Sequence, residues 1–367
     1  MRTNDMFSAA DYSFMALALQ LAERGLNTTT PNPRVGCVIV RDSKVIGSGW
    51  HQEAGQPHAE IHALDSAGTA THGATVYVTL EPCSHFGRTP PCANALIKAG
   101  IAKVIIATDD PNPIVSGRGR AILEQAKINV QTGLLEQQAR ELNIGFFNRM
   151  TKKKPWVRLK IAASLDGKTA LNNGASQWIT GESARTDGHR WRARSCAILT
   201  GIGTIQTDNP QLTVRHIKTT RQPQKIVIDR RLRISLDAKL LHSDVETWIF
   251  TAYDGDSNKR EQLDRMGVKV ITLPDRAGAV DLDKMMVLLA EWGINELLVE
   301  AGSGLNGALI AAGLVDEMIL YLAPHLLGNQ AVGMFDLSEL TNLIQKQTLK
   351  LRDVRMIGHD VRIIARL

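Results

Sequence analysis

Hydrophobic and polar positions change period several times along the first half of the chain, and each change predicts a new element. Apolar residues three and four apart between Phe14 and Ala22 predict an amphipathic helix. Short apolar runs predict strands at 35–40, 45–51, 75–80, 102–107 and 129–130. Helices are expected from His58, from Pro90–Pro91 and over 120–126. This alternation of strands and helices indicates an α/β sandwich.

The second half of the chain repeats the pattern with more strands. Apolar runs predict them at 156–163, 197–199, 225–229, 248–251, 268–271, 296–300, 317–322 and 361–364. Helical patterns lie between several of these runs, notably over 281–292, so a mostly parallel sheet is expected. Three lysines followed by proline, within 148–155, suggest a joint between a domain of residues 1–150 and a domain of residues 151–367. A nucleic-acid patch is the alternative, although no aromatic residue interrupts the lysines.

Composition narrows the class of protein. A chain of 367 residues exceeds the size at which one core usually stops growing, which agrees with two domains. Aromatic residues make up only 5%, so few platforms exist for stacking bases, and the net charge of +6 is modest for this length. Acidic residues flank the apolar N-terminal segment, no run is long enough to span a membrane, and four cysteines do not form a disulfide framework. We expect a cytoplasmic protein without a membrane or nucleic-acid partner.

One stretch carries the chemistry of the first domain. His58-Ala59-Glu60 is followed by Glu81-Pro82-Cys83 and then by Cys92. One histidine and two cysteines supply three zinc ligands and leave a fourth tetrahedral position for water, whose pKa the metal lowers. Glu60 is the candidate general acid and base. This is the pattern of zinc nucleobase deaminases. The alternatives are a structural zinc knuckle, which normally has four protein ligands, and cysteines and histidine without a metal.

The first half resembles the cytidine deaminase superfamily at T-x-P-N-P-x-V-G-C-V, residues 29–38, and at P-C-S-H-F-G-R-T-P-P-C, residues 82–92. Eight residues separate Cys83 from Cys92, where most nucleobase deaminases have C-x-x-C. In this longer spacing the chain resembles the deaminase of riboflavin biosynthesis, in which an insertion between the two cysteines is usual. The resemblance implies substrate contacts at Asn32, His51, His85 and Arg88. A cation such as Arg88 also suits a phosphorylated substrate, although a solvated surface arginine is the alternative.

Glycine-rich segments mark the second half. Residues 302–307 read G-x-G-x-x-G directly after a predicted strand, where backbone N–H groups at a helix start can hold a phosphate. Their place near the end of the domain argues against a Rossmann unit, and a tight strand-to-helix turn is the alternative. With the glycine-rich loop after the strand at 197–199, K-x-A-x-S-L-D-G at 160–167 and S-x-W-I-T at 176–180, they resemble the reductase of the same pathway.

That reductase family has the dihydrofolate-reductase fold and uses NADPH. The resemblance implies NADPH contacts at Ala162, Trp178, Thr204, Asp208, Gly302, Ser303, Gly304, Leu305, Asn306, Gly307 and Ala308, with Arg230 as a further candidate. It implies substrate contacts at Ser176, Arg192, Leu212, Arg215 and Glu300. Lys160 and Asp208 are candidates for proton handling, which structural salt bridges would explain equally well.

Nearly the whole chain therefore resembles the bifunctional pyrimidine deaminase/reductase family of riboflavin biosynthesis. The resemblance implies a cytidine-deaminase-like three-layer α/β/α domain with one Zn²⁺, followed by a dihydrofolate-reductase-like α/β domain. The reactions would be deamination of 2,5-diamino-6-ribosylamino-4(3H)-pyrimidinone 5′-phosphate and reduction to 5-amino-6-(5-phosphoribitylamino)uracil. A homo-oligomer, dimer or tetramer, is expected. The rivals are a tRNA or nucleoside deaminase fused to an unrelated domain, and a zinc-stabilised nucleotide-binding regulator.

Overall fold

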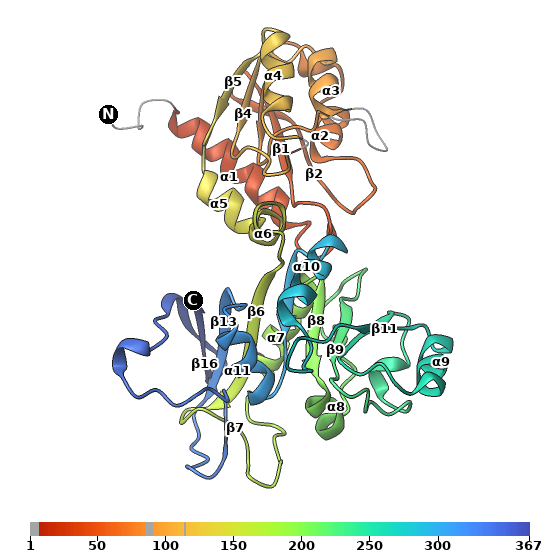
Figure 1. Ribbon diagram of the computed structural model, residues 1–367. Coiled ribbons are helices and arrows are strands. Elements are labelled where there is room, and N and C mark those ends of the chain that lie inside the picture. The colour runs from red at the N-terminus through yellow and green to blue at the C-terminus, as the bar shows by residue number, and fades with distance from the viewer. Residues whose placement is uncertain (1–6, 85–90, 114) are drawn as a thin grey trace. The chain divides into compact units, whose positions relative to one another are not determined.

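A computed structural model describes residues 7–84, 91–113 and 115–367, and the chain divides into two compact units, Met1–Lys153 and Lys154–Leu367 (Figure 1). Helix α6 (Ile144–Lys152) occupies most of the segment that the sequence suggested as a joint. The chain therefore passes from one unit to the next at Lys153 and Lys154, directly after the helix ends.

The first unit is built on a five-stranded sheet with the order β2-β1-β3-β4-β5. Its strands are β1 (Gly36–Arg41), β2 (Lys44–Trp50), β3 (Thr75–Val78), β4 (Lys103–Ile106) and β5 (Asn129–Thr132). Strand β1 is antiparallel to both β2 and β3, whereas β3, β4 and β5 are parallel. The helices are α1 (Ala9–Glu23), α2 (Ala59–Ala67), α3 (Cys92–Lys98), α4 (Arg118–Gln125), α5 (Glu136–Leu142) and α6, with a 3₁₀ turn η2 (Gly68–Thr71).

Alternation along the strands gives this sheet two apolar faces, each covered by helices. Ile39, Val76 and Val104 pack with α2, α3 and α4 on one face. Val38, Tyr77 and Ile105, each directly adjacent in its strand to one of these residues, pack with α1 and α5 on the other. The first unit is thus a three-layer α/β/α sandwich, as expected.

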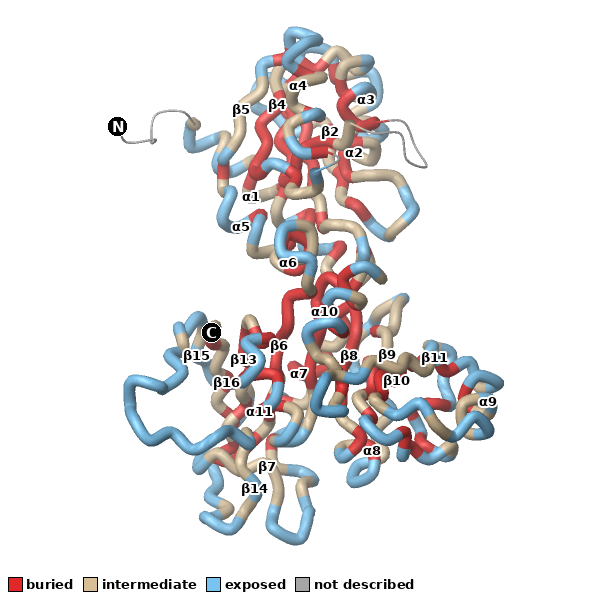
Figure 2. The backbone as a smooth tube through the Cα atoms, in the orientation of Figure 1, coloured by how far each residue is buried: buried red, intermediate tan, exposed pale blue. Residues whose placement is uncertain are grey.

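The second unit has a nine-stranded sheet with the order β11-β10-β9-β8-β12-β6-β13-β16-β15. Its strands are β6 (Trp156–Ser164), β8 (Ala197–Gly201), β9 (Gln224–Ile228), β10 (Thr247–Thr251), β11 (Val268–Thr272), β12 (Glu296–Val299), β13 (Glu317–Ala323), β15 (Lys350–Ile357) and β16 (Asp360–Arg366). All are parallel from β11 to β13, and β16 and β15 add an antiparallel hairpin. Figure 2 shows buried residues concentrated along β6 and β8 here and along β4 in the first unit.

Helices and short elements complete the second unit. They are α7 (Glu182–Arg194), α8 (Ile202–Asp208), α9 (Ser257–Arg265), α10 (Leu282–Glu291), α11 (Ser303–Ala311), the 3₁₀ turns η3 (Lys239–Leu241) and η4 (Leu343–Gln345), and the paired strands β7 (Lys168–Ala170) and β14 (Val332–Gly333). Among the described residues, no helix has both the length and the apolar character needed to cross a membrane.

A cluster of buried charged side chains links three neighbouring strands at the centre of this sheet. Arg158 on β6 is 2% exposed and lies between Glu296 on β12 and Glu317 on β13. Its Nη1 pairs with Glu296, and its Nε donates to Glu317 Oε2 at 2.7 Å. The charges of the two neighbouring strands thus meet on one guanidinium, which links all three strands.

Candidate active sites

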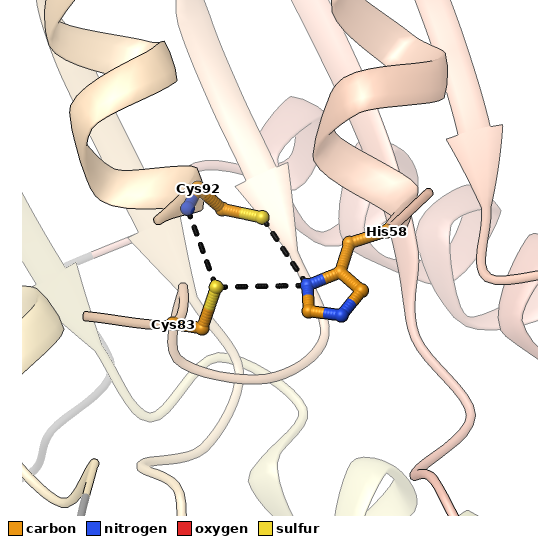
Figure 3. Close-up of side chains that lie close together, drawn as sticks. All are labelled: His58, Cys83 and Cys92. Carbon is orange, nitrogen blue, oxygen red and sulfur yellow. Dashed lines mark hydrogen bonds between the residues drawn. The ribbon is translucent and has the colours of Figure 1, made fainter. Parts of the chain in front are cut away.

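Three predicted zinc ligands converge in the first unit, each at the start of a helix or just beyond a strand (Figure 3). His58 caps the N-terminus of α2, Cys92 is the first residue of α3, and Cys83 lies in the turn that follows β3. Because β3 is central in the sheet and both helices pack on the same face, the fold brings these side chains together. Among the described residues, they form the one group of three ligand-type side chains whose donor atoms all lie within 4.8 Å.

The distances in this group fit a tetrahedral zinc ion. His58 Nδ1 lies 3.6 Å from Cys83 Sγ and 3.3 Å from Cys92 Sγ. Zinc bonds of about 2.3 Å to sulfur and about 2.0 Å to nitrogen, at a tetrahedral angle, require a separation of about 3.5 Å. The three residues can therefore hold the ion with little movement, and they leave one coordination position without a protein ligand.

Hydrogen bonding prepares one thiol for metal binding. The Cys92 side chain, with His58 and the Cys92 main-chain N–H, holds the pKa of Cys83 well below its usual range, although burial acts in the opposite direction. The same contact with Cys83, together with burial, raises the pKa of Cys92. A bound cation favours the thiolate form of both sulfurs, since zinc is coordinated by deprotonated cysteine.

Glu60 lies in the first turn of α2, two residues after His58, and is only 3% exposed. Burial raises the pKa of its carboxyl to about 7, with His58 lowering it and Cys83 raising it. A carboxyl group that is protonated and deprotonated near neutral pH can both accept and donate a proton, as a general acid and base must.

Two of the predicted substrate contacts lie beside the zinc ligands. The His51 ring is edge-on to the His58 ring, 5.4 Å away between centroids. Its Nδ1 lies 3.1 Å from the Pro57 carbonyl oxygen, which can only accept, so Nδ1 carries the proton and Nε2 accepts from Asn32 Nδ2 at 3.1 Å. Burial lowers the pKa of His51, which favours this neutral form. His85 and Arg88 lie outside the described residues.

The second candidate site lies at the carboxyl ends of β6, β8 and β12. Glu300, directly after β12, receives two hydrogen bonds from Arg192 of α7, at 2.6 Å and 2.9 Å, and lies 3.7 Å from Lys160 of β6. Although burial raises the pKa of Glu300, Arg192 and Lys160 bring it down to about 2. The structure thus brings together three predicted site residues, but Arg192 and Glu300 bind each other.

Positive charge dominates around that pair. Arg192 Nη1 donates to the Thr213 carbonyl oxygen at 3.0 Å, and the Arg215 main-chain N–H donates to His189 Nδ1, also at 3.0 Å. Burial, Arg192 and Arg215 lower the pKa of His189 to about 4, so this ring is neutral near pH 7. His189 belongs to this group, yet nothing in the sequence distinguished it, because its role depends on the main chain of a distant segment.

The other residues predicted to contact NADPH or the substrate of the second unit lie on several elements. Ser176 Oγ lies 3.4 Å from Asp208 Oδ1 at the end of α8, the helix that also carries Thr204. Trp178 is 69% exposed with Arg185 stacked over its ring, and Ala162 lies on β6. The Leu212 side chain packs into the core, which leaves only its main chain for a ligand contact. Arg230 donates to the carbonyl oxygens of residues 277 and 278.

The segment 302–308 differs from the loop that the sequence suggested. Helix α11 already begins at Ser303, and the glycine-rich segment after β8 is likewise the helix α8. A Cβ on Gly307 would lie 1.9 Å from the Asp336 carbonyl oxygen, and Asn306 Nδ2 donates to Met334. Asn306 and Gly307 therefore hold the strap 334–336, the segment that crosses this helix.

The first turn of α11 remains suited to a phosphate. A Cβ built on Gly302 or Gly304 meets nothing within 4 Å, and Gly302 caps the helix with extended backbone. N–H groups of a first helical turn point away from the helix and attract anions. These residues fit the phosphates of a dinucleotide, and α8 begins beside them after the neighbouring strand β8.

Comparisons with known proteins cover both units. Residues 8–108 match the cytidine and deoxycytidylate deaminase zinc-binding region, and residues 155–363 match the RibD C-terminal domain. The riboflavin biosynthesis protein RibD of Escherichia coli (strain K12) is 47% identical over 363 residues, which cover 96% of this chain and 98% of that protein. RibD of Bacillus amyloliquefaciens is 42% identical, covering 96% and 95%.

Solved structures agree with these matches. One crystal form of Acinetobacter baumannii RibD has a TM-score of 0.91 at 44% identity, covering 97% of this chain and 98% of that one. A diaminohydroxyphosphoribosylaminopyrimidine deaminase/5-amino-6-(5-phosphoribosylamino)uracil reductase from Thermotoga maritima has a TM-score of 0.86 at 33% identity, with the same coverage.

Proposed function

Because this chain belongs to the RibD family of bifunctional riboflavin biosynthesis enzymes, we propose that its first unit deaminates a phosphorylated pyrimidine and its second unit reduces the product, with the residues described above. The family, the α/β fold of both domains, and the use of zinc and NADPH are confirmed for this chain. The chain is a deaminase and a reductase, so a fused tRNA deaminase and a non-enzymatic regulator no longer apply.

The observation that carries the deaminase assignment is the convergence of His58, Cys83 and Cys92 beside a buried carboxyl group. Zinc held by these residues would supply the Lewis acidity that makes water a nucleophile near neutral pH. Glu60 would carry one proton from the attacking water to the ring nitrogen, and then a second proton, from the new hydroxyl group, to the departing amine. Asn32 and His51 hold the substrate ring, with the Asn32 amide oriented by its donation to His51.

The second unit acts on the sugar of the deaminated product. NADPH, when bound, supplies the hydride that reaches the ribosyl C1′. The first turn of α11, at residues 302–305, holds cofactor phosphate, with Trp178, Thr204 and Asp208 as further contacts. Arg192, Arg215 and Ser176 contact the substrate, and Lys160 beside Glu300 donates the proton that the opened sugar ring requires.

The Thermotoga maritima relative is a deaminase of diaminohydroxyphosphoribosylaminopyrimidine and a reductase of 5-amino-6-(5-phosphoribosylamino)uracil. For this chain we propose the same pair, with the phosphorylated ribosylaminopyrimidine as the substrate of the first unit. The cluster of Lys160, Arg192 and Arg215 supports an anionic substrate in the second unit, because it supplies three cations around one carboxylate.

Glu60→Gln in the full chain tests the division of labour. We expect ammonia release from the diaminopyrimidine to fall by about 10²- to 10⁴-fold, since the amide cannot shuttle a proton, while NADPH oxidation with the deaminated intermediate persists. Glu136→Gln, an exposed change on α5 of the same unit, is the matched control and should alter neither rate. Retention of deamination in Glu60→Gln, or loss of both activities in a folded variant, would contradict the assignment.

We also propose that the chain forms a homo-oligomer through strand β15. This strand is the last in the nine-stranded sheet, and Leu351, Val354 and Met356 on it are each more than half exposed. An exposed edge strand with apolar side chains favours pairing with a second copy. Light scattering after size exclusion should report an oligomer, and Val354→Lys should shift it to monomer. A wild-type monomer would contradict the proposal.

A cytoplasmic location fits the cysteines. All four are free thiols, including the two zinc ligands, and free thiols persist in a reducing compartment. Cell fractionation with detection of the chain tests this location directly.

A further inference from the structure

Glu81 is a buried carboxylate that the reaction does not use. It lies two residues before the zinc ligand Cys83, between the end of β3 and the ligand turn, and is 3% exposed. A buried carboxylate is costly unless hydrogen bonds or cations compensate its charge. Among the described residues, main-chain N–H groups provide that compensation.

Three N–H groups converge on this carboxylate. Glu81 Oε2 accepts from the N–H groups of Asp110, at 3.2 Å, and Gly117, at 3.0 Å, and Oε1 accepts from Arg120 at 3.1 Å. The donors belong to the loop before α4 and to the first turn of that helix, where N–H groups have no partner within the helix. Glu81 thus attaches the turn before Cys83 to the end of a different element.

Close packing of α4 and main-chain hydrogen bonds from other elements also fix this turn. A Cβ on Gly119 would lie 2.0 Å from the Pro82 carbonyl oxygen, so α4 approaches this turn as nearly as a glycine allows. The Glu81 main-chain N–H donates to Thr108 beyond β4 at 3.0 Å, and the Cys83 carbonyl oxygen accepts from Ala93 on α3 at 3.3 Å. The main chain that carries Cys83 is therefore held by three neighbouring elements.

We propose that Glu81 is a positioning residue of the zinc centre, which sets where Cys83 Sγ stands relative to His58 and Cys92. It lies outside the ligand group and acts by locking the Glu81–Pro82 turn against α4. The inference rests on the assignment of His58, Cys83 and Cys92 as the ligands. A glutamine at this position keeps the shape but presents an NH₂ group to at least one of the three N–H donors, which repels it and loosens the turn.

The experiment measures zinc affinity in the full chain, without any assay of activity. Wild type and Glu81→Gln are stripped of metal, checked for folding by circular dichroism, and titrated with zinc against a chromophoric chelator. We expect the variant to bind zinc about 10- to 100-fold more weakly, the usual effect of removing a group that orients a metal ligand. The Co²⁺-substituted variant should show an altered visible spectrum, because the sulfur position changes.

Tyr77→Phe is the matched control. It removes one buried hydrogen bond, from Tyr77 to Asp11 at 2.6 Å, on the opposite face of β3, and should leave zinc affinity unchanged. Gly119→Ala displaces the same turn while keeping Glu81, and should weaken zinc binding as well. If Glu81→Gln does not fold, Gly119→Ala decides the question.

Three results would overturn the inference: wild-type affinity in folded Glu81→Gln, wild-type affinity in Gly119→Ala when that variant has to decide, or an equal loss in Tyr77→Phe, which would indicate general destabilisation. If the wild-type chain itself fails to bind zinc, the ligand assignment fails rather than the role of Glu81.

Discussion

Replacing Glu300 by glutamine removes the carboxylate that, among the described residues, balances both Arg192 and Lys160. Arg192 binds both oxygens of this carboxylate, and each of the two side chains is 14% exposed. The variant keeps the size of the residue, so packing is preserved and the change tests charge alone. Two cations would then face each other across a neutral amide in a largely buried site.

The magnitude follows from the pKa of Glu300. Its pKa falls from 4.5 to about 2, chiefly because the effects of Arg192 and Lys160 outweigh that of burial. At about 1.4 kcal/mol per pKa unit, ionisation of Glu300 stabilises the fold by about 3 kcal/mol. This agrees with the cost of about 3–5 kcal/mol for removing one partner of a buried ion pair.

The sign of the pH dependence is fixed by the direction of that pKa. Because the folded value lies below the unfolded one, the stabilisation is fully present above pH 4.5 and is lost as pH falls toward about 2. Glutamine does not titrate. The difference in stability between wild type and Glu300→Gln should therefore be greatest near pH 7 and should shrink below pH 4.5.

Denaturant titration, monitored by tryptophan fluorescence, measures this difference. The signal reports mainly on the second unit, because five of the six tryptophans belong to it and only Trp50 belongs to the first. Glu261→Gln on α9, whose ion pair with Arg265 is exposed, is the control and should be neutral. An unchanged midpoint for Glu300→Gln at pH 7, or a difference that persists undiminished at pH 3, would refute the reasoning.

Three further predictions use other features. Gly307→Ala should destabilise the second unit by about 1–3 kcal/mol, since its Cβ would meet Asp336, whereas Gly304→Ala has open space and should not; equal denaturation midpoints would contradict this. Because the folded pKa of His189 is about 4, against 6.5 normally, its contribution to stability is lost as pH falls from 6.5 to about 4, and His189→Gln should flatten stability curves over that range. Removal of zinc by a chelator should abolish ammonia release but spare NADPH oxidation with the deaminated intermediate; joint loss would show that the units depend on each other.

The zinc centre was predictable from the sequence because its residues lie at strand ends and helix starts that are themselves marked. Pro57 and Pro91 predict where α2 and α3 begin, and His58 and Cys92 are the residues that follow them. The three-layer fold of the first unit follows from the same alternation. Hydrogen bonds to Glu81 were not predictable, since all three come from main chain about thirty or more residues away.

In the second unit, the local sequence pattern does not predict every contact of the site residues. The residues 302–307 look like a phosphate loop, yet Gly307 serves close packing against a segment that follows it in the chain. Arg192 and Glu300 are 108 positions apart, and the sequence predicted a substrate contact for each of them but not the hydrogen bonds between them. No helix was predicted at α5 or α6, and the lysines at the end of α6 suggested a joint instead. For Gly307 and for the Arg192–Glu300 pair, the tertiary contact leaves no trace in the spacing of the sequence.

The position of Arg158 has a consequence for how the chain is made. Strand β6 is the first strand of the second unit, but its central arginine pairs with glutamates 138 and 159 positions later. At a synthesis rate of about 5–20 residues per second, β6 stays without either neighbour for on the order of ten seconds. An apolar strand left unpaired for that time is prone to aggregate, and a charge at its centre opposes this. We therefore expect Arg158 to disfavour aggregation of the nascent strand until Glu296 and Glu317 have been synthesised.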